Sequence, residues 1–313
     1  MKLTYNQVLS RKNFTRGPEE LREEITVVIP TLNEAEAIGK LIDEIKVCGY
    51  KQILVVDGYS KDGTREIAEN HLGDAGRIVE QHGRGKSGAI LTATEIVDTP
   101  FFVVMDGDYT YDPADIDRFI PFMENYDHII GARPARSPNI SMTHKLGNRI
   151  LTTAFNMLMG SDIPDICSGM YLLRTDKIKQ FFFDKPGIVV DQEIAAQSSI
   201  NGRVTSVPIN YRARLGKSKI STWRQGLRSL FTILDLAKSY NPVLLFAGMA
   251  IVAIFPAVII LLYTAIQNYV FNNYRWGLAL LGAVLLLFSG QGVIIATLSS
   301  QMRRLERRLI EKD

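Results

Sequence analysis

The sequence predicts an α/β domain with a largely parallel sheet, followed by two membrane-spanning helices. Short apolar segments alternate with helical patterns over roughly the first 230 residues, which is typical of repeated βα units. Two uncharged segments follow, at 239–274 and 276–301, and each is long enough to cross the hydrocarbon core of a bilayer as a helix. A chain of 313 residues with 46% apolar residues can fill a core of this size.

Polar motifs follow three of the four segments that we expect to be strands. The expected strands are Ile25–Ile29, Gln52–Val56, Arg77–Val79 and Phe101–Met105. Pro30–Glu34 follows the first, Asp57–Thr64 the second, and Asp106–Asp108 the fourth. Because ligands of parallel α/β sheets bind at the carboxyl ends of the strands, we expect these motifs to converge on one cleft.

Asp106 and Asp108 are predicted to form a metal site. They flank a glycine directly after an apolar strand, so a turn can direct both carboxylates at one point. Hard oxygen ligands of this kind prefer Mg²⁺ or Mn²⁺. Such a cation neutralises the charge that develops on a departing diphosphate. A plain surface turn is the alternative interpretation of so short a motif.

A glycine-rich stretch, Gly83–Gly88, follows the third expected strand. It fits the dinucleotide-binding pattern G-x-G-x-x-G, but it lies in the third βα unit rather than the first. A P-loop is excluded, because it requires a glycine where this chain has Glu80. We interpret the stretch as a basic loop whose amides and Lys86 hold phosphate groups, with an ordinary helix start as the alternative.

Charge and cysteine content narrow the class of protein further. A net charge of +3 is too small to indicate a nucleic-acid partner. Cys48 and Cys167 lack metal-ligand spacing and fit a reduced compartment without disulfides. The polar first residues lack the apolar core of a secretory signal.

Basic residues gather in two segments that suit phosphate recognition. They are Arg133, Arg136, His144, Lys145 and Arg149 in one segment, and Arg212, Arg214, Lys217 and Lys219 in the other. A solvated charged surface is the alternative for each segment.

The patterns divide the chain into five segments. These are a polar N-terminal extension (1–24), the α/β domain (25–215), a basic loop with an amphipathic helix (216–241), two membrane helices (242–302, with spans at about 243–265 and 276–298), and a tail (303–313). Basic residues flank both outer ends of the hairpin, whereas its connector carries Arg275 alone. The positive-inside rule therefore predicts an integral cytoplasmic-membrane protein with the α/β domain and both termini in the cytoplasm.

The amphipathic segment 222–240 places Trp223, Leu227 and Leu234 at helical spacing beside arginines. This pattern predicts an interfacial helix whose apolar face contacts membrane lipid. A helix packed on its own domain is the alternative.

Several motifs, in order, resemble one known family. They are Val28–Glu34, Val55–Thr64, Met105–Asp108, Gly131–Arg133, Asp165–Leu173, Asp191–Glu193 and Tyr211–Lys219. Together they resemble glycosyltransferase family 2, especially its dolichyl-phosphate sugar synthases, over about residues 25–240. The chain looks most like archaeal dolichyl-phosphate hexose transferases of N-glycan assembly. The resemblance implies a GT-A (nucleotide-diphospho-sugar transferase) domain with interfacial helices and a closing membrane hairpin.

The resemblance also implies roles for donor-binding residues. Pro30 and Glu34 would line the nucleoside pocket, and Asp57 would contact the base or ribose. Asp106 and Asp108 would lie at the diphosphate and the metal.

Phosphate groups would be bound by Arg133 and by the segment from Arg212 to Lys219. The sequence differs from the family pattern at two positions that affect the identity of the donor. Gly58 replaces the second aspartate that the family usually has, and Thr110 stands where mannosyl members often have glutamine.

The resemblance implies inverting transfer of one hexose or N-acetylhexosamine to dolichyl or polyprenyl phosphate, which would initiate or feed protein N-glycosylation. UDP-Glc or UDP-GlcNAc is the preferred donor and GDP-mannose the next. The lipid phosphate is already an anion, so attack needs surrounding cations and exclusion of water rather than a general base. Asp191 is therefore predicted to orient the sugar or a basic side chain.

Two other functions remain as alternatives. A processive polysaccharide synthase needs more spans and a Q-x-x-R-W motif, which Trp223-Arg-Gln225 does not reproduce. A catalytically silent membrane scaffold is disfavoured by the intact Asp106 and Asp108.

Overall fold

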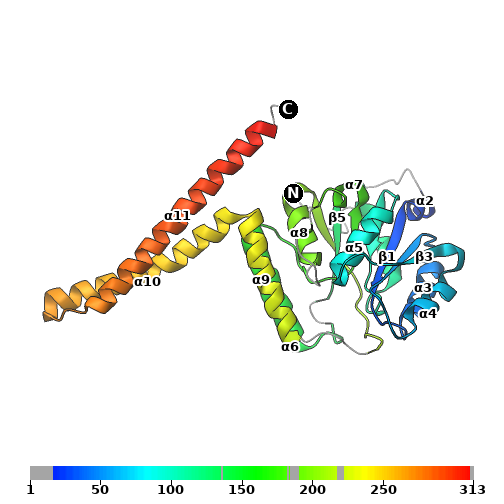
Figure 1. Ribbon diagram of the computed structural model, residues 1–313, viewed down its shortest axis with the longest axis horizontal. Coiled ribbons are helices and arrows are strands. Elements are labelled where there is room, and N and C mark those ends of the chain that lie inside the picture. Colours follow the sequence, from blue (N-terminus) through cyan, green and yellow to red (C-terminus); the bar gives the residue numbers. More distant parts are fainter. Residues whose placement is uncertain (1–16, 135–136, 182, 184–189, 217–221, 311–313) are drawn as a thin grey trace. The chain divides into compact units, whose positions relative to one another are not determined.

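The computed structural model describes residues 17–134, 137–181, 183, 190–216 and 222–310 (Figure 1). The chain forms two compact units, one ending at Thr232 and the other beginning at Ile233. The predicted phosphate-binding residues Lys217 and Lys219 lie outside the described residues, as do Arg136 and the first part of the N-terminal extension.

A seven-stranded mixed sheet forms the centre of the first unit, in the order β3-β2-β1-β4-β6-β5-β7. The strands are β1 (Ile25–Thr31), β2 (Ile53–Asp57), β3 (Gly76–Glu80), β4 (Phe101–Val104), β5 (His128–Ala132), β6 (Tyr171–Arg174) and β7 (Val204–Pro208). Strands β3, β2, β1 and β4 pair in parallel, and so do β5 and β7. Among these strands, only β6 is antiparallel to both of its neighbours, β4 and β5. The predicted, largely parallel sheet is confirmed.

Helices cover both faces of the sheet, because successive strand residues point to opposite faces and both faces are apolar. Val27 and Ile29 of β1 belong to a core that includes α3 (Ile38–Val47) and α4 (Thr64–Leu72). Val28 belongs to the opposite core, with α5 (Gly85–Ile96) and α8 (Val190–Asn201). The remaining elements of this unit are α2 (Pro18–Glu23), α6 (Met142–Met159), α7 (Thr175–Ile178) and the 3-10 turns η1 (Gly73–Ala75), η2 (Pro113–Arg118) and η3 (Ile120–Phe122); α9 (Thr222–Tyr240) begins in it.

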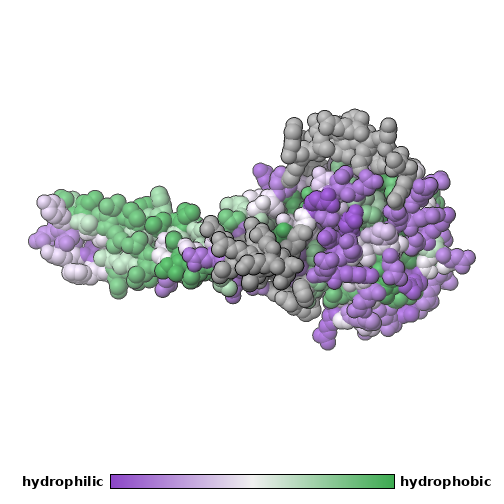
Figure 2. All heavy atoms as spheres, turned by 90° about the horizontal axis from the view of Figure 1, so that it is seen from above, coloured by the Kyte–Doolittle hydropathy of each residue, from purple (hydrophilic) through white to green (hydrophobic). Residues whose placement is uncertain are grey.

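The second unit contains a hairpin of two long helices, α10 (Pro242–Phe271) and α11 (Trp276–Ile310). Pro242–Phe271 and Trp276–Met302 are long and apolar enough to cross a membrane. Their large apolar side chains are mostly exposed, including Phe255 at 71% and Leu287 at 70%, and apolar surface covers the hairpin in Figure 2. A core helix of a soluble protein would bury such residues. The hairpin therefore indicates membrane association.

Candidate active site at the carboxyl edge of the sheet

The loops after β1 and β2 are bonded to each other at the carboxyl edge of the sheet. The Asn33 amide donates to Ser60 Oγ at 2.7 Å, and the Lys61 amide donates to Asn33 Oδ1 at 2.7 Å. The Glu34 amide donates to Thr64 Oγ1 at 2.8 Å. Asn33 adopts φ 51°, a left-handed conformation that asparagine tolerates. These bonds hold the Pro30–Glu34 motif beside the Asp57–Thr64 motif.

Asp57 closes the turn that follows β2. Its carboxylate is buried and accepts hydrogen bonds from the Ser60 hydroxyl at 2.5 Å and the Ser60 amide at 3.0 Å. Aspartate favours turns of this kind, which its own side chain closes by accepting hydrogen bonds from nearby residues. The turn fixes the carboxylate at the strand end, where the family resemblance implies contact with the base or ribose.

Each aspartate of the Asp-Gly-Asp turn is paired with a cationic side chain. Asp106 Oδ1 lies 2.7 Å from Lys86 Nζ. Asp108 accepts hydrogen bonds from Arg214 Nη1 at 2.6 Å and from the Thr110 hydroxyl at 2.5 Å. Burial, together with the neighbouring charge of Asp106, raises the pKa of Asp108.

Lys86 links this turn to helix α8. Its ammonium lies between Asp106 and Asp191, 2.9 Å from Asp191 Oδ2, and the Tyr171 hydroxyl donates to Asp191 Oδ1 at 2.8 Å. Burial alone would lower the pKa of Lys86, but the charges of Asp106 and Asp191 outweigh it and raise the pKa. Burial raises the pKa of Asp191. Three residues predicted separately are thus brought into one partly buried cluster.

Gly169 lies directly against the carboxylate of Asp106. A Cβ at Gly169 would be 2.0 Å from Asp106 Oδ2, so a side chain there would displace the carboxylate. The Gly169 amide donates to the Tyr111 hydroxyl oxygen at 2.6 Å, which fixes the backbone in this position. The absence of a side chain at Gly169 is therefore a requirement of the site.

Arg212 and Arg214, predicted together as phosphate ligands, lie in different environments. The Arg212 amide donates to the Thr110 carbonyl at 2.8 Å, so the segment runs beside the Asp-Gly-Asp turn. Arg214 contacts Glu34 and Asp108 at 2.5 and 2.6 Å.

The Arg212 guanidinium instead bonds Glu44 at 2.6 Å and Asp112 at 2.8 Å. It also stacks over the Tyr109 ring. The structure therefore brings Arg214, but not Arg212, to Asp108.

Arg133 is held in a buried, two-pronged pair with Asp165. Its Nε and Nη2 donate to the two Asp165 oxygens at 2.7 and 2.9 Å, and its guanidinium lies over the Tyr211 ring. Asp165 also accepts from the Cys167 amide. The pair ties the end of β5 to the segment that leads to Gly169. Lys145 and Arg149, from the same basic segment, lie on α6, where Arg149 is exposed.

Among the described residues, no group of three or more His, Cys, Asp or Glu side chains could hold a metal ion alone. Asp106 and Asp108 supply two carboxylates, and Mg²⁺ in particular commonly completes its shell with water and substrate phosphates. Lys86 and Arg214, beside the same carboxylates, are suited to bind phosphate oxygens. The residues fit a divalent cation that is shared between the protein and a diphosphate.

Three contributors to the site had no signal of their own in the sequence. Asp165, Gly169 and Tyr171 all lie within the family-like segment Asp165–Leu173, and no individual signal in the sequence indicates a role for them. Gly169 lies close to the predicted metal ligand Asp106 because β6 pairs with β4, and this pairing is the information that the sequence patterns lacked.

Comparison with known proteins identifies the chain. The sequence profile of glycosyl transferase family 2 matches residues 26–182. The chain belongs to glycosyltransferase family 2. This family 2 glycosyltransferase is 31% identical to glycosyltransferase AglJ of Haloferax volcanii over 296 residues, which cover 92% of this chain and 96% of that protein.

Two further relatives of this family 2 glycosyltransferase are named for lipid phosphates. The dolichyl-phosphate hexose transferase of Haloferax volcanii is 28% identical over 210 residues, covering 65% of this chain and 90% of the relative. The polyprenol monophosphomannose synthase of Mycolicibacterium smegmatis is 28% identical over 214 residues, covering 62% and 80%.

The fold also matches solved structures. Glucosyl-3-phosphoglycerate synthase from Mycobacterium tuberculosis, in complex with Mn²⁺, UDP-glucose and phosphoglyceric acid, aligns with a TM-score of 0.59 at 18% identity. The match covers 76% of this chain and 85% of that one. At this identity the likeness concerns the fold, and it confirms the expected GT-A architecture.

Proposed function

We propose that this glycosyltransferase transfers one sugar from a nucleotide donor to dolichyl or polyprenyl phosphate at the membrane, with inversion at the anomeric carbon. The observation that carries the proposal is the pairing of Asp106 and Asp108 with Lys86 and Arg214 at the carboxyl edge of the sheet. Relatives named for dolichyl and polyprenyl phosphates, and the apolar hairpin, support a lipid acceptor.

In the donor half of the site, Asp106 and Asp108 would hold Mg²⁺ or Mn²⁺. The bound metal would neutralise the charge on the leaving diphosphate. Lys86 and Arg214 lie on the same carboxylates and are placed to bind diphosphate oxygens. Pro30, Glu34 and Asp57 would contact the nucleoside. Lys217 and Lys219 would contact the phosphates.

The acceptor half needs no proton acceptor, because a lipid phosphate attacks as an anion. The contacts of Asp191 support a positioning role, since its two oxygens accept from Tyr171 and Lys86. Asp191 would therefore fix Lys86 against the diphosphate rather than remove a proton. Arg133, oriented by Asp165, remains our proposed ligand for the lipid phosphate.

UDP-Glc or UDP-GlcNAc is the proposed donor, with GDP-mannose second. Thr110 supports this order, because its hydroxyl buttresses Asp108 at 2.5 Å instead of presenting an amide ligand to the metal. The proposed role of the product is to initiate or feed protein N-glycosylation.

The proposed location is the cytoplasmic face of the membrane, with both termini in the cytoplasm. Exposed apolar residues support an interfacial position for two helices: Leu227, Phe231 and Leu234 on α9, and Met142, Leu146 and Ile150 on α6. On α6, the basic residues Lys145 and Arg149 are next to these apolar residues in the sequence.

The test uses the full-length protein purified in detergent. It would be incubated with Mn²⁺ or Mg²⁺, dolichyl phosphate, and UDP-Glc, UDP-GlcNAc or GDP-mannose separately, and lipid-linked sugar would be detected by mass spectrometry. We expect a metal-dependent product from one donor that Asp108→Asn abolishes. Donor binding without any lipid product would contradict the proposal, and a sugar polymer would indicate the processive alternative.

A further inference from the structure

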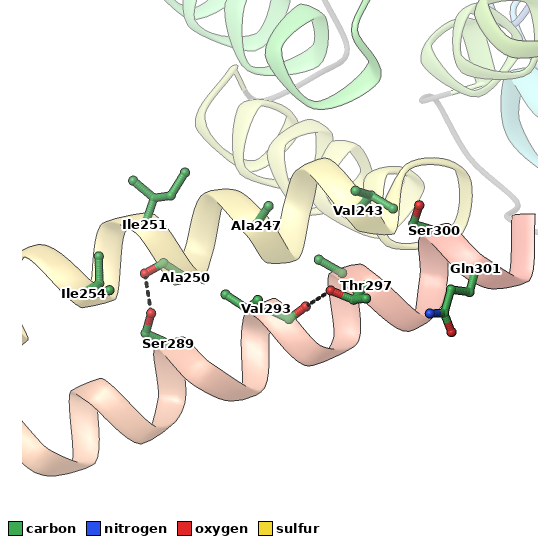
Figure 3. Close-up of a pocket in the computed structure, with 11 residues that line it drawn as sticks. Val243, Ala247, Ala250, Ile251, Ile254, Ser289, Val293, Thr297, Ser300 and Gln301 are labelled. Carbon is green, nitrogen blue, oxygen red and sulfur yellow. Dashed lines mark hydrogen bonds between the residues drawn. The ribbon is translucent and has the colours of Figure 1, made fainter.

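An apolar groove lies between the two helices of the hairpin. It has a volume of about 540 Å³ and lies toward the end at which α10 begins (Figure 3). Val243, Ala247, Ile251 and Ile254 line it from α10, and Val293 and Thr297 from α11. All of these residues belong to the second unit.

The two helices are in close contact along a line next to the groove. Ser289 Oγ donates to the Ala250 carbonyl at 2.9 Å, and a Cβ on Gly292 would lie 3.0 Å from the Phe246 carbonyl oxygen. Beside this line, Ala247 is too small to fill the space between the helices. An opening therefore remains on that side.

The walls of the groove present carbon atoms rather than free polar groups. The hydroxyls of Ser289 and Thr297 donate to backbone carbonyls at 2.9 and 2.8 Å, as Figure 3 shows. A water molecule needs several polar partners to occupy such a space. The chemistry of the walls therefore favours a hydrocarbon occupant.

The groove has a polar end. Ser300 and Gln301 line it there, and Arg303 and Arg304 follow in the sequence. Arginines at the end of a membrane helix attract anionic lipid headgroups. The occupant that fits is an amphiphile with its hydrocarbon along Ile251 and Ile254 and its anionic group at the arginine end.

We propose that this groove binds the isoprenoid tail of the polyprenyl phosphate acceptor, with the phosphate toward Ser300 and Gln301. The inference rests on the proposed function. An isoprenoid chain carries methyl branches at regular intervals, and Ala247 leaves a recess between the larger Val243 and Ile251 at the spacing of a helical turn, about 5.4 Å. A linear acyl chain has no branches to fill such recesses.

The direct test is photocrosslinking with a polyprenyl phosphate that carries a diazirine in the isoprene units next to the phosphate. The full-length protein in phosphatidylcholine nanodiscs would be irradiated, and the labelled peptides mapped by mass spectrometry. We expect labelling within 243–254 and 289–301 that excess unlabelled polyprenyl phosphate removes. Labelling spread evenly over the hairpin, or insensitive to this competitor, would overturn the inference.

A variant that fills the groove provides the second test. Ala247→Leu should reduce the labelling and raise the KM for polyprenyl phosphate about tenfold, equivalent to about 1.4 kcal/mol, and leave the KM for the donor unchanged. Ala265→Leu, at an exposed position of α10 outside the groove, is the matched control and should change neither value. An Ala247→Leu variant with unaltered labelling and KM would overturn the inference.

The outcomes separate the groove from the proposed function. Specific labelling of a protein that transfers no sugar supports the groove and contradicts the proposed reaction. Sugar transfer to polyprenyl phosphate with labelling elsewhere contradicts the groove alone. If Ala247→Leu changes the oligomeric state in native mass spectrometry but not the labelling, the groove is a docking face for another copy and the inference falls.

Discussion

At the residue scale, the space beside Asp106 depends on Gly169. Gly169→Ala places a methyl group where Asp106 Oδ2 lies, 2.0 Å from the ideal Cβ, so the carboxylate must move. A shift of about 1 Å in a catalytic group can cost about 10²-fold in rate, and we expect a loss in kcat of this order with weaker Mn²⁺-dependent donor binding. Steady-state kinetics and calorimetric titration measure both. Gly147→Ala on α6, where a Cβ meets no atom within 4 Å, is the control and should behave as wild type.

The hydroxyl of Tyr171 gives a second prediction at this scale. Tyr171→Phe keeps the buried ring but removes the hydrogen bond to Asp191, which otherwise holds Lys86. A hydrogen bond to a charged group contributes about 1.5–3 kcal/mol, so we expect kcat/KM to fall roughly 10- to 100-fold.

The pH–rate profile distinguishes positioning from base catalysis at Asp191. If Asp191 only positions Lys86, Asp191→Asn should lower the rate but retain the acid limb of the wild-type profile. Loss of that limb would assign Asp191 as a general base and contradict our mechanism.

His128 makes the first unit sensitive to acid. It is buried on β5 against the Tyr171 ring, and burial lowers the pKa of His128 from 6.5 to about 3. The unfolded chain therefore binds a proton that the folded protein does not, so stability from this residue is complete above about pH 6.5 and falls below it by about 1.4 kcal/mol per pH unit.

His128→Phe should remove this contribution to acid sensitivity. Thermal unfolding of the full-length protein between pH 7.5 and 5 is the measurement, and the variant should show a smaller decrease in Tm than wild type. Identical pH dependences would contradict the assignment of a neutral buried histidine.

At the scale of elements, one short extended segment performs two tasks. Arg212 and Arg214 pair with different carboxylates. Arg214→Gln should weaken donor binding, since Arg214 contacts Asp108 and Glu34. Arg212→Gln should leave donor affinity unchanged. It should lower the Tm by about 2–4 °C, which corresponds to a loss of about 1 kcal/mol in the free energy of unfolding. The reason is that it removes ion pairs with Glu44 and Asp112 that are only partly screened by solvent. Donor affinity and Tm measured on both variants test this division, and a larger loss of affinity in Arg212→Gln would reverse the assignment.

The strands show why some elements were predictable and others were not. The predicted bounds of β1, β2, β3 and β4 agree with the structure within two residues, because short apolar segments at the start of βα units are local signals. No prediction was made for β5, β6 and β7. The insertion of β6 between β4 and β5, antiparallel to both, depends on pairing between residues far apart in the chain, such as Val104 with Tyr171.

The same distinction applies to the site. The strand-edge rule predicted the positions of Asp57, Asp106 and Asp108. The contact of Lys86 with Asp191 joins residues 105 positions apart, and no periodicity encodes it. Local patterns therefore located the site but did not pair its members.

At the scale of the whole molecule, the charge asymmetry of the hairpin predicts its topology. A tag inserted between Asn272 and Asn273 should be accessible only from the outer face of the membrane, and a tag at the C-terminus only from the cytoplasm. Protease protection of tagged protein in sealed vesicles tests both positions. Protection of both tags on the same side would exclude a two-span hairpin.

The ion-pair cluster at the sheet edge has a consequence for the order in which ligands arrive. Its members are Glu34, Asp106, Asp108, Asp191, Lys86 and Arg214. Four negative and two positive formal charges leave −2, the complement of one divalent ion. The diphosphate of a nucleotide sugar is a dianion, so without metal the proposed donor would meet electrostatic repulsion there, whereas its neutral metal chelate would not. In the proposed reaction, the cluster would therefore favour binding of the donor together with its metal ion, or after that ion has bound.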